Sequence, residues 1–124
     1  MRTPTSPLIR VSAVAVLLAS AALAGTAEIY GRPLRGLTLV RVAEILRDPK
    51  ALGARTFRID GRCERTVAGA LAVRDAEAVI ALEVIGFAVP ENAVGARIAA
   101  EGRIGAADKR NPVRFLADGV EVAR

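Results

Sequence analysis

Residues 57–64 alternate strictly between two kinds of side chain, and this period of two constrains the fold more than any other feature. One phase is apolar or small and the other is charged: Phe57, Ile59, Gly61 and Cys63 against Arg58, Asp60, Arg62 and Glu64. Because successive side chains of a strand point to opposite faces, the pattern predicts a β-strand with one buried face. Gly61 in mid-strand indicates a bulge or sharp bend, as in a strongly coiled barrel strand.

Four further stretches downstream also have the pattern of strands. They cover residues 69–73, 78–84, 96–104 and 113–122, and the last is expected to break at Asp118-Gly119. Turn-forming residues separate them, and the sequence contains no internal repeat. Together with the strand that begins at Arg55, the chain has five predicted strands.

One amphipathic helix is expected before the first strand. Thr38 is a suitable N-cap. Apolar side chains then follow at helical spacing: Leu39, Val42, Ile45 and Leu46. Asp48-Pro49 ends this helix, Pro49 starts a further short turn, and Gly53 closes it.

A helix followed by five short strands, with a glycine inside the long first strand, predicts a mainly β fold. The architecture we expect is a small five-stranded OB-like barrel, in which closure removes the exposed sheet edges. A five-stranded sheet packed against the helix is the alternative. Residues 38–124 are assigned to this single domain, and residues 25–37, which are punctuated by glycine and proline, to a lead-in segment.

The first 24 residues have the features of a cleavable signal peptide, expected to form a helix ahead of the domain. Arg2 and Arg10 precede an uncharged apolar run over residues 11–24. Small side chains near its end place the cut between Ala24 and Gly25, with a second possible cut after Ala27. The run is shorter than the roughly 20 residues of a membrane span, and an uncleaved anchor is the alternative. We therefore expect a periplasmic or secreted protein without a stable membrane anchor.

Composition argues against several kinds of chemistry. The chain has no histidine, and Cys63 is its single cysteine, so the commonest general base and zinc ligand are missing and no internal disulfide can form. All serines lie in the first 20 residues, and no histidine can activate the threonines. The carboxylate pairs Asp75 with Glu77 and Glu83 with Glu101 show no spacing beyond chance. We expect no catalytic residue, no metal and no cofactor, and hence no enzyme.

Cys63 shares the phase of Phe57 and Ile59, so we predict that its thiol is a small buried hydrophobe. The alternative is a reactive or intermolecular thiol.

Four arginines on the polar phase of predicted strands are weak candidates for a ligand-binding stripe: Arg58, Arg62, Arg97 and Arg103. The alternative is that they are solvated and paired with Asp60, Glu64 and Glu101. The net charge of +5 falls by two when the signal arginines are removed, so the domain itself is only mildly basic.

Nucleic-acid binding is a common function of OB barrels, which stack bases on exposed aromatic rings. The aromatic residues here are Tyr30, Phe57, Phe87 and Phe115. Phe57 and Phe115 fall in the core phase, and Phe87 is expected to plug a barrel end. We therefore predict an exported binding or interaction module for a protein, peptide or small-molecule partner. The alternatives are a nucleic-acid-binding OB domain and a structural or assembly protein.

Short motifs along most of the domain resemble exported bacterial proteins of the domain of unknown function 4920 type. The similar residues are Tyr30-Gly31, Pro33, Thr38, 42–46, Asp48-Pro49, Gly53, 57–61, 86–90, Gly95, Glu101-Gly102 and 117–120. The resemblance implies an OB-like barrel. It departs where the family carries a cysteine and a Gly-Cys-Trp hairpin, because residues 66–71 read Thr-Val-Ala-Gly-Ala-Leu. No functional residue of the family is therefore transferred.

Overall fold

The computed structural model describes residues 27–123. The predicted signal peptide, its cut between Ala24 and Gly25, and the first residues of the lead-in segment lie outside this range. The elements in chain order are β1 (Glu28–Gly31), α2 (Val42–Arg47), the 3-10 helix η1 (Pro49–Leu52), β2 (Phe57–Arg65), β3 (Leu71–Asp75), β4 (Ala78–Val84), the 3-10 helix η2 (Glu91–Ala93), β5 (Arg97–Gly105) and β6 (Arg114–Val122).

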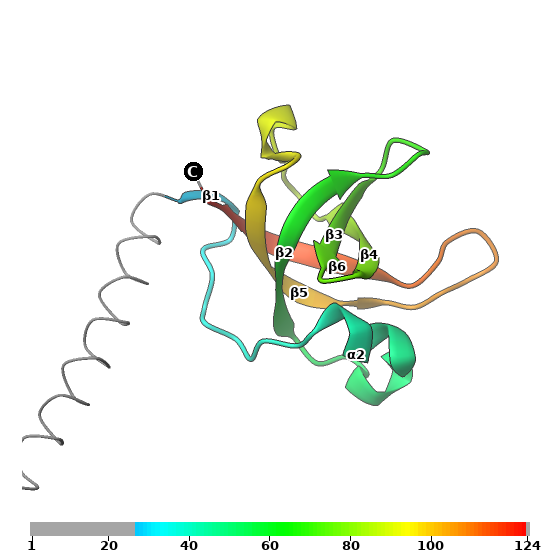
Figure 1. The fold of residues 1–124 in the computed structure, drawn as a ribbon. Coiled ribbons are helices and arrows are strands. Elements are labelled where there is room, and N and C mark those ends of the chain that lie inside the picture. Colours follow the sequence, from blue (N-terminus) through cyan, green and yellow to red (C-terminus); the bar gives the residue numbers. More distant parts are fainter. Residues whose placement is uncertain (1–26, 124) are drawn as a thin grey trace, which may run out of the picture.

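Strands β2 to β6 close into a barrel (Figure 1). β2 pairs antiparallel with both β3 and β5, and β3 pairs antiparallel with β4. β6 completes the ring because it lies parallel to β4 and antiparallel to β5. The predicted five-stranded OB-like barrel is confirmed, and the open sheet packed on a helix is wrong.

The alternation in β2 sets the inside and outside of the barrel. Phe57, Ile59 and Cys63 are each at most 1% exposed, as the phase predicts. The rings of Phe57 and Phe115 meet edge to face, with centroids 5.3 Å apart. Burial of such side chains contributes about 1.5–3 kcal/mol each to folding. Figure 1 shows α2 below one end of this barrel and η2 at the other.

The helix begins later than predicted. Thr38 does not cap it, because the carbonyl of Thr38 accepts the N–H of Arg58 and the N–H of Val40 donates to the carbonyl of Arg58. These bonds to β2 hold residues 38–40 extended, so α2 starts at Val42. Of the four apolar positions in the predicted helix, Val42 and Ile45 are buried, whereas Leu39 and Leu46 are exposed.

The lead-in segment contains a strand that the sequence did not indicate. β1 pairs with the C-terminal half of β6, from Glu28 opposite Val122 to Gly31 opposite Gly119. The chain then crosses the outer face of the barrel over β6 and β5, and we call residues 32–37 the strap. The predicted break at Asp118-Gly119 is a bulge, since the β5–β6 register shifts there while β6 continues.

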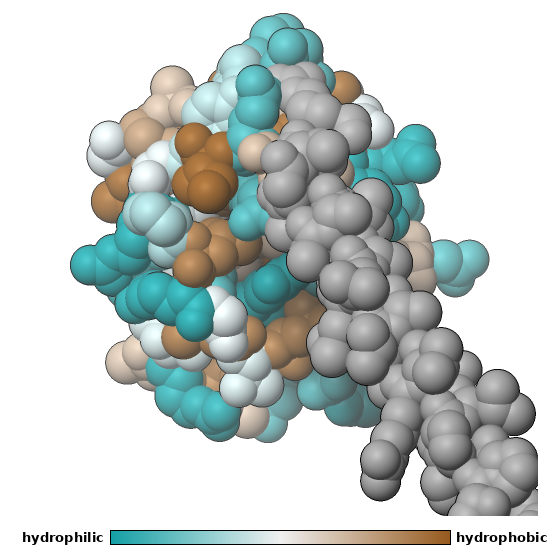
Figure 2. Space-filling model, turned by 90° about the vertical axis from the view of Figure 1, so that its left-hand side faces the viewer, coloured by the Kyte–Doolittle hydropathy of each residue, from teal (hydrophilic) through white to brown (hydrophobic). Residues whose placement is uncertain are grey.

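Large hydrophobic side chains are exposed at separate places on the domain, at Ile29, Leu39, Leu46, Val67 and Ile85. Figure 2 shows small hydrophobic patches among hydrophilic residues on the face it presents. Scattered patches of this kind are ordinary for a protein surface. Within residues 27–123, no helix is both long and apolar enough to span a membrane.

Candidate binding groove

A buried carboxylate holds the strap against the barrel. Glu101 lies on the outer face of β5 and is 1% exposed. One of its oxygens accepts the backbone N–H of Arg35 at 2.7 Å, and the other accepts the N–H of Leu37 at 2.8 Å. Between them, Gly36 has a φ of +74°, a conformation that side chains rarely adopt. The strap thus presents successive N–H groups to an anion, as backbone nests do.

Electrostatics keep Glu101 ionised. Burial by itself would raise the pKa of its carboxyl, but the N–H groups of Arg35 and Leu37 and the Arg35 guanidinium outweigh that effect. The pKa of Glu101 therefore lies below its ordinary value. Burying a charge costs free energy unless the charge is hydrogen-bonded. The carboxylate therefore needs the N–H groups of the strap, and the strap is held in place by the carboxylate.

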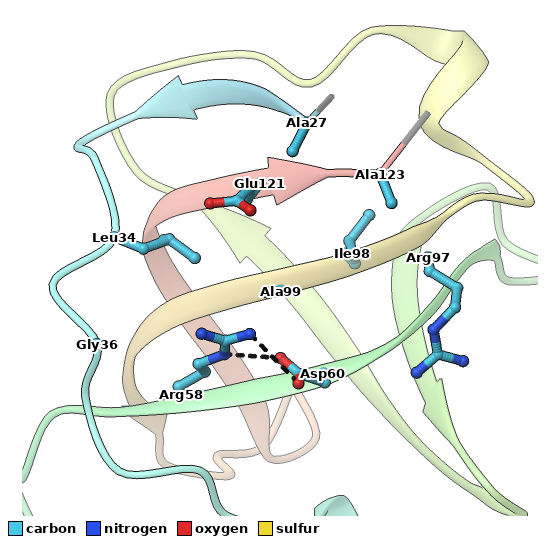
Figure 3. Close-up of a pocket in the computed structure, with 10 residues that line it drawn as sticks. All are labelled: Ala27, Leu34, Gly36, Arg58, Asp60, Arg97, Ile98, Ala99, Glu121 and Ala123. Atoms are coloured by element: carbon cyan, nitrogen blue, oxygen red, sulfur yellow. Dashed lines mark hydrogen bonds and ion pairs between the residues drawn. The ribbon is translucent and has the colours of Figure 1, made fainter. Parts of the chain in front are cut away.

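A groove of about 510 Å³ lies between the strap and the outer faces of β2, β5 and β6. Its lining residues are Ala27, Leu34, Gly36, Arg58, Asp60, Arg97, Ile98, Ala99, Glu121 and Ala123. Figure 3 shows Leu34 pointing in from the strap at one end, Arg97 at the other, and Ala99 on the strand between them. The hollow exists because the side chain at this central position is only a methyl group.

Charged side chains of both signs border the groove. The register places Asp60, Ala99 and Glu121 in one row across three strands. Asp60 is bound by Arg58 at 2.8 Å, and this hydrogen bond raises the pKa of the Arg58 guanidinium above its ordinary value. Within residues 27–123, Glu121 and Arg97 form no ion pair, although the charge of Glu121 acts on Arg58 and that of Arg97 on Asp75.

The four arginines predicted as a ligand-binding stripe are only partly brought together. Arg62 and Arg97 are directly opposite each other on β2 and β5. Arg58 lines the groove but is paired with Asp60, as the alternative predicted. Arg103 lies opposite Leu116 on β6 and does not line the groove.

Three of the four carboxylates whose spacing was considered in the sequence, Asp75, Glu83 and Glu101, have other partners in the structure. Asp75 accepts the guanidinium of Arg41 and the N–H of Val42, which together hold its pKa below the ordinary value. Glu83 is paired with Arg114 at 3.2 Å. Glu101 is not paired with Glu83 and lies beneath the strap.

The predicted burial of the Cys63 thiol is confirmed. Its side chain is fully buried in the barrel, and burial raises the pKa of the thiol above its ordinary value. A protonated, inaccessible thiol is a poor nucleophile. Cys63 therefore belongs to the core and not to the groove.

Sequence reasoning missed the strap, Glu101 and Glu121 as parts of a site. Glu101 falls on the polar phase of its strand, which predicts exposure. The glycine and proline punctuation of the lead-in segment, at Gly31, Pro33 and Gly36, carried the only signal that it makes specific turns.

A second hollow of about 640 Å³ lies between η1 and the base of the β5–β6 loop. Its lining is mostly small or apolar: Asp48, Pro49, Lys50, Gly53, Ile104, Ala106, Ala107 and Val113. Few polar groups converge there, whereas small-molecule sites usually combine apolar walls with placed polar groups. The groove beneath the strap is therefore the better candidate.

The strand order and barrel closure place this chain among the OB-like barrels. A solved structure described as an aspartyl-tRNA synthetase from Leishmania major Friedlin matches it with a TM-score of 0.51 and 12% identity over 73% of this chain. The match covers 21% of the synthetase chain, and at this identity the likeness concerns the fold alone. No family model and no curated protein matches the chain, so the resemblance to the 4920-type domain remains a prediction.

Proposed function

We propose that this chain is an exported binding module that holds a small molecule or short peptide in the groove beneath the strap. The observation that carries the proposal is the fixed strap over a charged hollow. Because Glu101 anchors the strap on two sides of Gly36, the groove is formed before a ligand arrives. Its volume of about 510 Å³ is within the range of small-ligand sites, roughly 300–1,000 Å³.

Nucleic acid is the weaker candidate. Phe57 and Phe115 are buried, and Phe87 packs over Gly31, where a Cβ atom would lie 2.6 Å from its ring. None of these three rings offers an open stacking platform. A small ligand fits the groove without needing one.

Filling the groove should abolish ligand binding. The protein, purified from cells that express the full chain, is titrated with a panel of amino acids, di- and tripeptides and monosaccharides, and backbone amide shifts are recorded. We expect at least one compound to perturb residues 34–36, 58–60 and 97–99. Ala99→Leu should remove the response, because the larger side chain occupies the floor of the groove.

Ala81→Leu, on the outer face of β4 and away from the groove, is the matched control and should leave binding unchanged. A panel with no effect on the groove residues would contradict the proposal. So would shifts confined to Ile104, Ala106 and Val113, or unchanged binding by Ala99→Leu.

Export is the second part of the proposal, and the apolar run at residues 11–24 supports it. When the full chain is expressed in a Gram-negative host, we expect a periplasmic product that begins at Gly25, or at Glu28 if the second cut is used. Intact mass and terminal sequencing measure this. An uncut chain that remains in the cytosolic or membrane fraction contradicts it.

A further inference from the structure

A row of three arginines runs across the outer face of the barrel beside the groove. Arg62 of β2 lies opposite Arg74 of β3 on one side and opposite Arg97 of β5 on the other. Paired residues project from the same face, and their Cβ atoms are about 5 Å apart. Arg97 is the member of the row that lines the groove, and Figure 3 shows it at one end, so the row lies beside that end.

Two of these arginines, Arg62 and Arg97, form no ion pair with a carboxylate within residues 27–123, although the Arg97 guanidinium lies close enough to Asp75 to act on its charge. The neighbouring carboxylates are bound by guanidinium groups other than those of Arg62 and Arg97. Arg74, the third member of the row, binds Glu64 at 2.6 Å, while Arg58 binds Asp60 at 2.8 Å and Arg41 binds Asp75 at 2.9 Å. Arg62 and Arg97 are thus opposed like charges, and such pairs destabilise a sheet. No ion pair of Arg62 or Arg97 offsets this repulsion within the described residues.

A carboxylate without an ion pair in the described residues lies across the groove from this row, near the guanidinium of Arg58. Glu121 is opposite Ala99, which is two residues along β5 from Arg97. A two-residue step is about 7 Å and one strand spacing about 4.8 Å, which puts the backbones of Arg97 and Glu121 about 8 Å apart. Within the described residues, the Glu121 carboxylate has no ion pair or hydrogen bond. The groove therefore has a cationic end and an anionic end.

We propose that the groove binds a small zwitterion, with its oxyanion on Arg62 and Arg97 and its ammonium group facing Glu121. This inference rests on the proposed binding function and specifies the class of ligand. Guanidinium groups bind planar oxyanions through paired hydrogen bonds, whether the oxyanion is a carboxylate or a phosphate. The methyl group of Ala99 leaves room for the atoms that link the two charged ends.

Four probes test the proposal by amide-shift titration of the purified protein: trialanine, N-acetyl-trialanine, trialanine amide and phosphoethanolamine. We expect trialanine to bind, and amidation of its carboxyl end to raise Kd about tenfold or more. The double variant Arg62→Gln/Arg97→Gln should raise Kd for trialanine by a similar factor. In Glu121→Gln, trialanine and N-acetyl-trialanine should bind with the same Kd, whereas the wild-type protein should bind trialanine more tightly.

Arg103→Gln is the matched control, because Arg103 is also exposed on the outer face of β5 but lies outside the row. It should leave Kd unchanged. Tighter binding of phosphoethanolamine than of trialanine, lost in the same double variant, would assign the oxyanion to a phosphate and supports the site.

The inference is overturned if end-blocked and free trialanine bind equally, or if the double variant keeps the wild-type Kd. In either case the groove proposal survives, provided that Ala99→Leu still abolishes binding. If none of the four probes perturbs the groove, the zwitterion inference is wrong, even where another panel compound binds there.

Discussion

Glu101→Ala is expected to lower the free energy of unfolding by about 3–5 kcal/mol. The carboxylate is buried and accepts the partly buried N–H groups of Arg35 and Leu37, and alanine would leave both of these strap donors unpaired against the barrel. Each buried donor left without a partner costs about 1–3 kcal/mol. Urea denaturation measures the change, and release of the strap should weaken any ligand binding in the groove as well.

Glu121→Gln is the matched control, since the Glu121 carboxylate makes no hydrogen bond within the described residues. This substitution should change the free energy of unfolding by no more than about 0.5 kcal/mol. Equal stability of Glu101→Ala and the wild-type protein would show that the strap does not depend on the carboxylate.

The Glu101 carboxylate should also make stability depend on pH. Its pKa is lowered in the folded protein, so its stabilising effect is present above the ordinary glutamate pKa of about 4.3 and is lost as the pH falls through the lowered value. Glu101→Gln should remove this part of the acid dependence, and a profile that keeps it would assign it to other carboxylates.

Gly102→Ala is expected to cost about 3 kcal/mol or more. A Cβ at this position would overlap the backbone carbonyl oxygen of Leu116, where β5 and β6 close the barrel next to the bulge at Asp118. A backbone oxygen in a paired strand cannot move aside as a side chain can, so the two strands would have to separate. Thermal and urea unfolding both report this loss.

Gly105→Ala on the same strand is the control. There a Cβ would meet only side-chain atoms of Arg114 and Leu116, at 3.0–3.1 Å. These side chains can shift, and we expect a change below about 1 kcal/mol. If both variants lose the same free energy of unfolding, the loss comes from replacing any glycine of the strand. The close approach at Gly102 would then not explain it.

The barrel could be predicted from the sequence because its dominant signal is local. The period of two from Phe57 to Cys63 follows directly from strand geometry, and burial of these side chains confirms it. The β4 strand was predicted with the bounds that the structure has, since turn residues flank its apolar run on both sides. The β2–β5 register runs through Gly61 without the bulge that the sequence indicated, and a glycine is needed there because the backbone of β3 comes close.

The helix start and the buried glutamate could not be predicted because both depend on distant residues. Thr38 has the local features of an N-cap, but its backbone pairs with Arg58 of β2. Glu101 lies on the polar phase, and only the strap, more than 60 residues earlier in the chain, buries it. Periodicity reports which face a residue is on, and it does not report what later covers that face.

The arginine candidates show the same limit. Strand phase placed Arg58, Arg62, Arg97 and Arg103 on the outer face, but register decides which of them are neighbours. Only the β2–β5 register brings Arg62 opposite Arg97.

The central claim is that Glu101 fixes the strap over the barrel and so forms the groove in the absence of ligand. Amide hydrogen exchange at Arg35 and Leu37 tests it most directly. We predict exchange at least about 100-fold slower there than at exposed loop residues such as Ala68 and Ala107, and loss of this protection in Glu101→Ala. Exchange at Arg35 and Leu37 as fast as at those loop residues would contradict the claim.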